Sequence, residues 1–298
     1  MGVGICLPIA EPHAADEGSL RYREIVTAAR AAEELGFDSV WFEDHFLFRR
    51  PDGGEFGAWS PWITAGAIAE ATERVQIGFV VSCVNWFNPG MVARMTETLD
   101  EISDGRLVLG IGAGWNQPEF DIFAYPFDHR ASRFEDAIVI LNQLLRTGAS
   151  NHDGRFYQTR DAVSRPRGPR SEAGGPPILV GTSGERMLDL TARYADAWNT
   201  AWHPTAAAAT EKLSLLTTAC ERAGRDPATM TTTVGVNIEL EGTTSKRGNS
   251  LTGSPEEIAA ELGRFRAAGF DHLIAGVSPC TPENLASFAK IVELSEGS

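Results

Sequence analysis

The stretch Leu107–Phe120 reads LVLGIGAGWNQPEF and gives the clearest indication of the fold. Its first five residues are mainly apolar and predict a short buried strand. Gly112 and Gly114 follow, and glycines directly after a strand let the backbone turn sharply and lie close to a ligand. Trp115 and Asn116 come next. A parallel strand that ends in such a turn commonly contributes to a binding site.

Outward from this stretch, short apolar runs alternate with helical segments along the chain. The expected strands are Val3–Leu7, Ser39–Phe42, Val75–Val81, the run that begins at Leu107, Ile178–Val180, Ala197–Asn199, Thr231–Leu240 and Asp271–Val277. The expected helices are Leu20–Leu35, Trp59–Ala71, Met91–Ile102, Arg133–Leu145, Glu185–Tyr194, Ala206–Ala223, a helix from Ser254 to Ala268, and Pro282–Leu294. Eight strand–helix units predict an α/β protein, a single (β/α)8 TIM barrel over residues 1–298.

Two segments interrupt this alternation. Phe46–Ala58 contains PDGG and is expected to be a mobile loop or lid. Gly148–Gly175 is polar and is expected to be an insertion between the fourth and fifth strands, with a short β segment around Phe156. The alternative architecture is a doubly wound open sheet, but no G-x-G-x-x-G motif follows the first strand.

Composition narrows the class of protein. The net charge of −14 argues against nucleic acid or an anionic membrane surface as a partner, because both need basic patches. The N-terminus has no basic region of the kind that begins a signal peptide, and no run approaches the ~20 apolar residues of a membrane span, so a cytoplasmic protein is expected. The four cysteines form no CxxC pair and are expected to be reduced thiols. Metal binding is not expected, since no HxH or HExxH motif is present.

The active site of a TIM barrel lies at the carboxyl ends of its strands. Asp44 and His45 directly follow the second expected strand, which makes them the candidate catalytic residues. His45 is the better acid or base, because imidazole titrates near neutral pH. The alternative is that both side chains only form hydrogen bonds within a loop.

A second candidate feature is the run Gly181–Gly184, which lies between the fifth strand and its helix. Exposed N–H groups and the positive end of the helix dipole favour an anion there, and Thr182 and Ser183 add hydroxyl donors. A plain turn at the start of the helix is the alternative. The candidate substrate pocket is formed by Trp86, Trp115, Glu119 and Trp202, whose aromatic members could form the wall of a flat, conjugated ligand.

Three stretches resemble the bacterial luciferase-like flavin and deazaflavin oxidoreductases. They are LGFDSVWFEDHF (Leu35–Phe46), the segment Ala71–Phe120, which includes SCVNWFNPG and GIGAGWNQPEF, and PPILVGTSGERMLDLTARYADAWNT (Pro176–Thr200). The resemblance implies a barrel, usually a homodimer, that binds FMN or coenzyme F420 at its carboxyl end. The EDH sequence is more similar to the F420-using branch, in which the His lies at the deazaflavin ring and acts in proton transfer.

The resemblance also implies roles for individual residues. It places a cis non-proline peptide that backs the ring at Val80–Val81 and the cofactor phosphate at Gly181–Gly184. It places Gly112, Ala113 and Gly114 along the ring or ribityl chain. The full set of implied cofactor contacts is Val80, Val81, Ser82, Asn85, Gly112, Ala113, Gly114, Asn116, Gly181, Thr182, Ser183 and Gly184.

Two positions depart from the sugar-phosphate-oxidising members of this group. Trp115 stands where those members carry a Glu that acts as an acid, and no Trp follows His45 closely, with Arg49 nearby instead. The first hypothesis is therefore an F420-dependent oxidoreductase that acts on a small organic substrate of unspecified identity. The alternatives are an FMN-dependent monooxygenase that uses reduced flavin and O2, and a non-catalytic flavin-binding protein.

Overall fold

The computed structural model describes residues 1–11, 21–49, 54–243 and 249–297. Within them, eight parallel strands form a closed barrel, each paired with the next, and the last pairs with the first. The strands are β1 (Gly2–Cys6), β2 (Ser39–Phe42), β5 (Gln76–Phe79), β7 (Leu107–Gly112), β10 (Ile178–Gly181), β11 (Ala197–Thr200), β12 (Thr231–Ile238) and β14 (His272–Val277). The predicted TIM barrel is confirmed.

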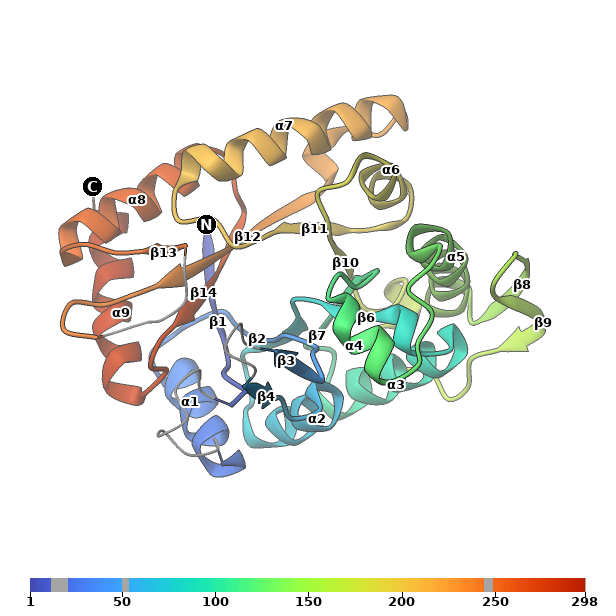
Figure 1. Ribbon diagram of the computed structural model, residues 1–298, viewed down its shortest axis with the longest axis horizontal. Helices are drawn as coiled ribbons and strands as arrows, with labels where there is room; N and C mark the ends of the chain where they lie inside the picture. Colours follow the sequence, from blue (N-terminus) through green and yellow to red (C-terminus); the bar gives the residue numbers. More distant parts are fainter. Residues whose placement is uncertain (12–20, 50–53, 244–248, 298) are drawn as a thin grey trace.

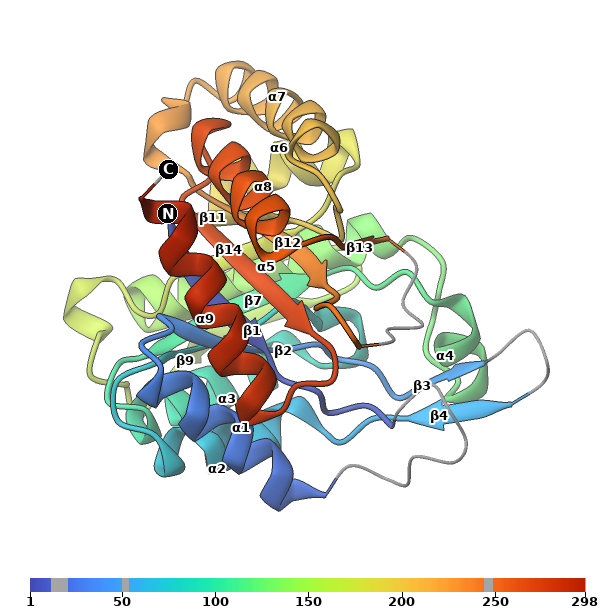
Figure 2. The same cartoon turned by 90° about the vertical axis from the view of Figure 1, so that its left-hand side faces the viewer.

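Helices surround the barrel, as Figures 1 and 2 show. They are α1 (Tyr22–Glu34), α2 (Pro61–Ala71), α3 (Pro89–Ile102), α5 (Arg130–Thr147), α6 (Glu185–Tyr194), α7 (Ala206–Arg222), α8 (Pro255–Ala267) and α9 (Pro282–Glu296). Their apolar faces pack on the strands; in α5, for example, Phe134, Ile138 and Leu141 are fully buried. All eight agree with the sequence prediction to within a few residues at each end.

Local sequence signals explain where several helices begin and end. Ser254 caps α8, and its hydroxyl accepts a hydrogen bond from the N–H of Glu257 while the Glu257 carboxylate accepts one from the N–H of Ser254. Gly36 follows α1 with φ +83°, a conformation that glycine adopts without steric cost. The short helix α4 (Gln117–Ile122) was not expected, because six residues are too few to show a helical repeat.

The segment Phe46–Ala58 differs from the expected loop. Its described residues form an antiparallel hairpin of β3 (Leu47–Arg49) and β4 (Glu55–Gly57); residues 50–53 lie outside the described residues. Phe48 and Phe56 face each other across the hairpin with ring centroids 4.9 Å apart, and such cross-strand aromatic pairs stabilise a sheet. The described part of the expected loop is thus a hairpin, and its role as a mobile segment or lid stays a prediction.

The segment at 148–175 contains a second antiparallel hairpin, β8 (Ala149–Asp153) and β9 (Gln158–Val163), which forms a sheet separate from the barrel. Phe156 lies in the turn of this hairpin and not in a strand, which corrects the expected β segment. An Asp–Gly pair immediately precedes Arg155 and Phe156, and such pairs favour a turn.

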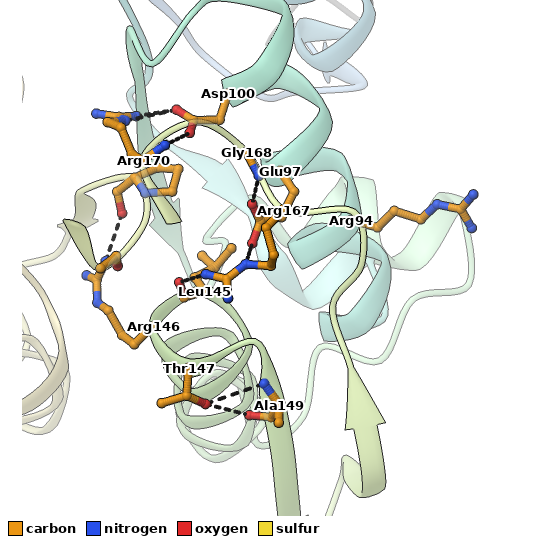
Figure 3. Close-up of polar contacts among 12 residues, drawn as sticks. Arg94, Glu97, Asp100, Leu145, Arg146, Thr147, Ala149, Arg167, Gly168 and Arg170 are labelled. Atoms are coloured by element: carbon orange, nitrogen blue, oxygen red, sulfur yellow. Dashed lines mark hydrogen bonds and ion pairs between the residues drawn. The ribbon is translucent and has the colours of Figure 1, made fainter. Parts of the chain in front are cut away.

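Two ion pairs fasten the chain after β9 to α3, as Figure 3 shows. The Arg167 Nε donates to the Glu97 carboxylate over 2.6 Å, and the N–H of Gly168 donates to its other oxygen over 2.6 Å. Arg170 donates to Asp100 over 2.6 Å. Both carboxylates are buried and have lost contact with water, so the arginine and backbone partners supply the hydrogen bonds that water would otherwise make.

The described residues include no helix long and apolar enough to cross a membrane. All four cysteines are free thiols, and three of them are buried.

Candidate active site

The carboxyl ends of the barrel strands surround a cavity of about 1640 Å³. Most of the residues predicted for the site line this cavity. They are Asp44, His45, Val80, Val81, Trp86, Gly112, Ala113, Gly114, Trp115, Glu119, Gly181, Thr182, Ser183, Gly184 and Trp202. The strand-end rule therefore brought together residues that lie far apart in the sequence.

His45 leaves the end of β2 and is held by a buried carboxylate. Its Nδ1 lies 3.0 Å from Oε2 of Glu119, the first-turn residue of α4. The Glu119 side chain is fully buried, whereas 14% of the His45 side chain is exposed. The His45 ring also packs on Phe48 with centroids 4.3 Å apart and meets Trp115 edge to face at 5.7 Å. The imidazole is thus fixed on three sides.

Glu119 is ionised at neutral pH. Burial by itself would raise its pKa, but the hydrogen bond and charge of His45 oppose that effect, as do the N–H groups of Phe46 and Leu47. Together these groups hold the pKa of Glu119 below its usual value of 4.5. Glu119 was predicted as a wall of the substrate pocket, and the structure shows that its polar atoms are directed at protein donors.

Asp44 is a second buried carboxyl group on the cavity wall. Its Oδ2 accepts a hydrogen bond from the Ser82 hydroxyl over 2.6 Å and from the N–H of Cys83 over 3.3 Å. Burial raises its pKa to about 6, although the bonds from Ser82 and Cys83 and the charge of His45 work in the opposite direction. The pKa of Asp44 thus lies nearer to neutral pH than that of an ordinary aspartate, a shift often found at functional sites.

The Val80–Val81 peptide bond is cis, at the position that the resemblance implied. The Val81 side chain packs between two predicted glycines. A Cβ atom added to Gly112 would lie 2.7 Å from one Val81 methyl group, and a Cβ atom added to Gly181 would lie 2.8 Å from the other. These glycines are needed for the packing of Val81, whether or not a ligand approaches them.

Gly114 has a related role with a different neighbour. Its φ is +77°, and a Cβ atom there would lie 2.6 Å from both the Cys83 sulfur and the Phe120 ring. The glycine turn after β7 therefore lets the chain's own side chains come close to the backbone. Contact of this turn with a cofactor stays a prediction.

Three predicted cofactor contacts, Ser82, Asn85 and Asn116, lie behind the cavity wall instead. Ser82 bridges Trp62 and Asp44. The Asn85 amide donates to the carbonyls of Ala113 and Arg130. The Asn116 amide donates to Glu119 over 2.9 Å. Their side chains thus support Asp44, Ala113 and Glu119, which line the cavity.

The run Gly181–Gly184 opens onto the cavity at the start of α6. Ser183 and Gly184 are exposed, and a Cβ atom on Gly184 would have no neighbour within 4 Å. The backbone is held from behind by Trp198, whose Nε1 donates to the Thr182 carbonyl over 2.8 Å. The first N–H groups of a helix have no partner within it, so this end of α6 is suited to an anion.

The cavity also has lining residues that were not predicted, among them Arg130, Lys212 and the segment 276–283 after β14. That segment could have been found from the sequence, because the strand-end rule applies to the eighth strand as well. Arg130 and Lys212 lie on helices, where no motif marks them. Among the described residues, no group of three or more His, Cys, Asp or Glu could hold a metal ion.

A closed parallel barrel with a large cavity at its carboxyl end defines the class of TIM-barrel proteins that bind a ligand there. Residues 1–243 match the family model described as luciferase-like monooxygenase, and the chain belongs to this family.

Curated relatives of this chain carry functional names. The F420-dependent glucose-6-phosphate dehydrogenase of Amycolatopsis mediterranei (strain U-32) is 33% identical over 184 residues, which are 59% of this chain and 52% of the relative. The F420-dependent hydroxymycolic acid dehydrogenase of Mycobacterium tuberculosis (strain ATCC 25618 / H37Rv) is 29% identical over 278 residues, 91% of this chain and 69% of the relative. The chain thus spans about half the length of the first relative. Both names describe oxidoreductases.

A solved structure shares the fold over nearly the whole chain. It is an F420-dependent secondary alcohol dehydrogenase in complex with an F420–acetone adduct, which superposes with a TM-score of 0.82 at 20% sequence identity. The superposition covers 99% of this chain and 98% of that structure.

Proposed function

We propose that this protein is an F420-dependent oxidoreductase that transfers a hydride between C5 of the deazaflavin and a small organic substrate. The observation that carries the proposal is the position of His45, an imidazole fixed at the cavity wall by Glu119. The names of the relatives support F420 as the cofactor and a dehydrogenase as the type of enzyme.

The residues present fit such a cofactor. The cavity of about 1640 Å³ has room for a tricyclic ring with a phosphorylated side chain and for a substrate beside it. Val80, Val81 and Trp202 supply apolar surface, and the open start of α6 at Gly184 supplies N–H donors for a phosphate. When bound, F420 would supply a carbon that accepts or returns a hydride.

The work of this chain is orientation and proton transfer. In alcohol oxidation, the imidazole of His45 takes the hydroxyl proton as the hydride leaves the adjacent carbon, so that the product is a neutral carbonyl. In the reverse direction it returns that proton to the carbonyl oxygen. Asp44 lies next to His45 on the same wall, and its pKa of about 6 lets it exchange a proton with solvent or with a bound molecule.

The cavity lacks two features of the sugar-phosphate-oxidising members, which bears on the substrate. At position 115 an indole replaces the acidic group, and 66% of this Trp is exposed. Glu119 cannot substitute as an acid, because it is ionised and already accepts four hydrogen bonds. The second departure is the missing Trp after His45; Arg49, which lies nearby in the sequence, is paired with Glu55 over 3.0 Å. We therefore propose a small alcohol or carbonyl compound other than a sugar phosphate.

Titration of the purified protein with F420 and with FMN, followed by absorbance and fluorescence, tests the cofactor. We expect saturable F420 binding and reduction of F420 in the presence of alcohols. Tight binding of FMN alone, with O2 consumed from reduced FMN, would instead establish a monooxygenase, which the family name allows. Binding of either cofactor without any turnover would indicate a flavin-binding protein.

The homodimer and the cytoplasmic location also remain proposals. Family members of this kind are expected to pair, and the charge and composition suit the cytoplasm. Light scattering coupled to size-exclusion chromatography will distinguish a mass near 32.2 kDa from twice that value.

A further inference from the structure

Glu119 accepts every hydrogen bond in which its carboxylate takes part. Its Oε1 receives the N–H groups of Phe46 and Leu47, over 2.6 and 3.2 Å. Its Oε2 lies 2.9 Å from the amide nitrogen of Asn116 and 3.0 Å from Nδ1 of His45. A carboxylate that is surrounded by donors and has a lowered pKa carries no proton of its own.

It follows that the proton between Glu119 and His45 belongs to His45. An ionised carboxylate only accepts, so Nδ1 of His45 must be the donor. In a neutral imidazole that carries its proton on Nδ1, Nε2 has a free lone pair. Among the described residues, no hydrogen-bond partner of Nε2 is present. Nε2 is thus the ring nitrogen available to the cavity.

We propose that Glu119 is a positioning residue that holds His45 in the Nδ1–H tautomer and thereby makes Nε2 the proton acceptor of the site. The consequence for turnover rests on the proposed function, whereas the tautomer itself does not. Glu119 also fixes the start of the β3–β4 hairpin through Phe46 and Leu47, so one carboxylate sets both the orientation and the protonation of the ring.

The substitution Glu119→Gln separates these two tasks. The glutamine carbonyl can still accept from the N–H groups of Phe46 and Leu47, but its amide nitrogen is a donor and would face Nδ1 of His45. The ring would then carry its proton on Nε2 and could not accept one from an alcohol. In serine proteases, a carboxylate-to-amide change of this kind lowers turnover by about 10⁴-fold through the wrong tautomer.

Asp136→Asn is the matched control. Asp136 also accepts two backbone N–H groups and one ring nitrogen, from His152, but it lies outside the cavity lining. The Asp136→Asn substitution therefore removes a comparable buried carboxylate but leaves the surroundings of His45 unchanged.

The first experiment is ¹⁵N NMR of the cofactor-free wild-type protein labelled in its six histidines, with His45 assigned from a His45→Gln variant. Above pH 8 we expect a protonated Nδ1 and an unprotonated Nε2 for His45. A protonated Nε2 in the wild type would overturn the proposal, and this result needs neither a folded variant nor a known substrate.

The second experiment compares the variants. Glu119→Gln should move the His45 proton to Nε2 and lower alcohol oxidation by at least about 100-fold, with F420 affinity changed less than about threefold; Asp136→Asn should change neither. A Glu119→Gln protein with the wild-type tautomer and wild-type turnover would overturn the proposal. Full turnover of His45→Ala would overturn the proposed function, and the NMR result on wild type would still decide the tautomer.

Discussion

Two hairpins in this protein, β3–β4 and β8–β9, lie apart in the fold and are anchored in the same way (Figure 1). At β3–β4, Glu119 accepts the N–H groups of Phe46 and Leu47 and a nitrogen of His45. At β8–β9, Asp136 accepts those of Phe156 and Tyr157 and a nitrogen of His152. In both cases a carboxylate on a helix ties two consecutive N–H groups and an imidazole together.

The difference lies in what the histidine faces. His45 and Glu119 line the cavity, whereas neither His152 nor Asp136 does. His45 uses Nδ1 for the carboxylate and His152 uses Nε2. We propose that the same local chemistry stabilises a hairpin at one place and prepares an acid–base group at the other. Position at the carboxyl end of the barrel would then decide between the two roles.

The largest difference is expected from removal of each imidazole. His45→Ala should lower F420 reduction by about 10²- to 10⁴-fold, because a positioned acid–base group contributes that much. His152→Ala should stay within about twofold of wild type, since its ring is outside the cavity. Initial rates at saturating cofactor measure both. Equal losses in the two variants would break the comparison.

Removal of the carboxylates should show what the two anchors share. Glu119→Ala and Asp136→Ala each leave two backbone N–H groups without their acceptor, which should cost about 1–3 kcal/mol. Both carboxyl groups have lowered pKa values, so this stabilisation is present above pH 4.5 and is lost as the pH falls through the lower folded-state values. Urea unfolding at pH 7 and pH 3.5 measures the loss, and a cost that is unchanged at pH 3.5 would contradict it.

Asp44→Asn and Asp136→Asn should respond to pH in opposite directions. The pKa of Asp44 rises from 3.8 in the unfolded chain to about 6, so its contribution to stability is full below pH 3.8 and is lost as the pH rises through about 6. Relative to wild type, Asp44→Asn should therefore gain up to about 3 kcal/mol between pH 4 and pH 8. Relative to wild type, Asp136→Asn should lose stability as the pH rises toward 3.8 and should change little between pH 4 and pH 8, because the lowered pKa of Asp136 places its titration below that range. Unfolding curves at several pH values measure both slopes, and parallel slopes would refute the assignment.

The smallest effects are expected from the aromatic residues of the two hairpins. Phe48 packs on His45, with centroids 4.3 Å apart, and Phe156 packs on Arg133, whose guanidinium lies 4.4 Å from the ring centroid. Phe48→Ala should raise the KM for the alcohol about three- to tenfold, because the loss of one aromatic contact is worth about 1 kcal/mol. Phe156→Ala should leave KM unchanged. A raised KM in Phe156→Ala but not in Phe48→Ala would show that the β8–β9 hairpin, and not β3–β4, contributes to substrate binding.

Periodicity in the sequence was enough to determine the barrel. The alternation of apolar runs and helical segments specifies eight strand–helix units, and caps such as the one formed by Ser254 and Glu257 mark helix ends. The strand-end rule then identified Asp44, His45 and Gly181–Gly184 as members of one cavity. These inferences succeed because they depend on local pattern and on a topology with a fixed active-site end.

Only the tertiary structure decided which side chains face each other. Glu119 is 74 residues from His45, and no spacing in the chain predicts that its carboxylate turns toward the imidazole. Likewise, Ser82, Asn85 and Asn116 follow predicted strands closely, yet their side chains donate hydrogen bonds to protein groups behind the wall. The direction of a side chain after a strand depends on the turn it enters and on partners that other segments supply. The sequence therefore determined the end of the barrel at which the candidate site lies, and packing determined that Nδ1 of His45 meets Glu119 there.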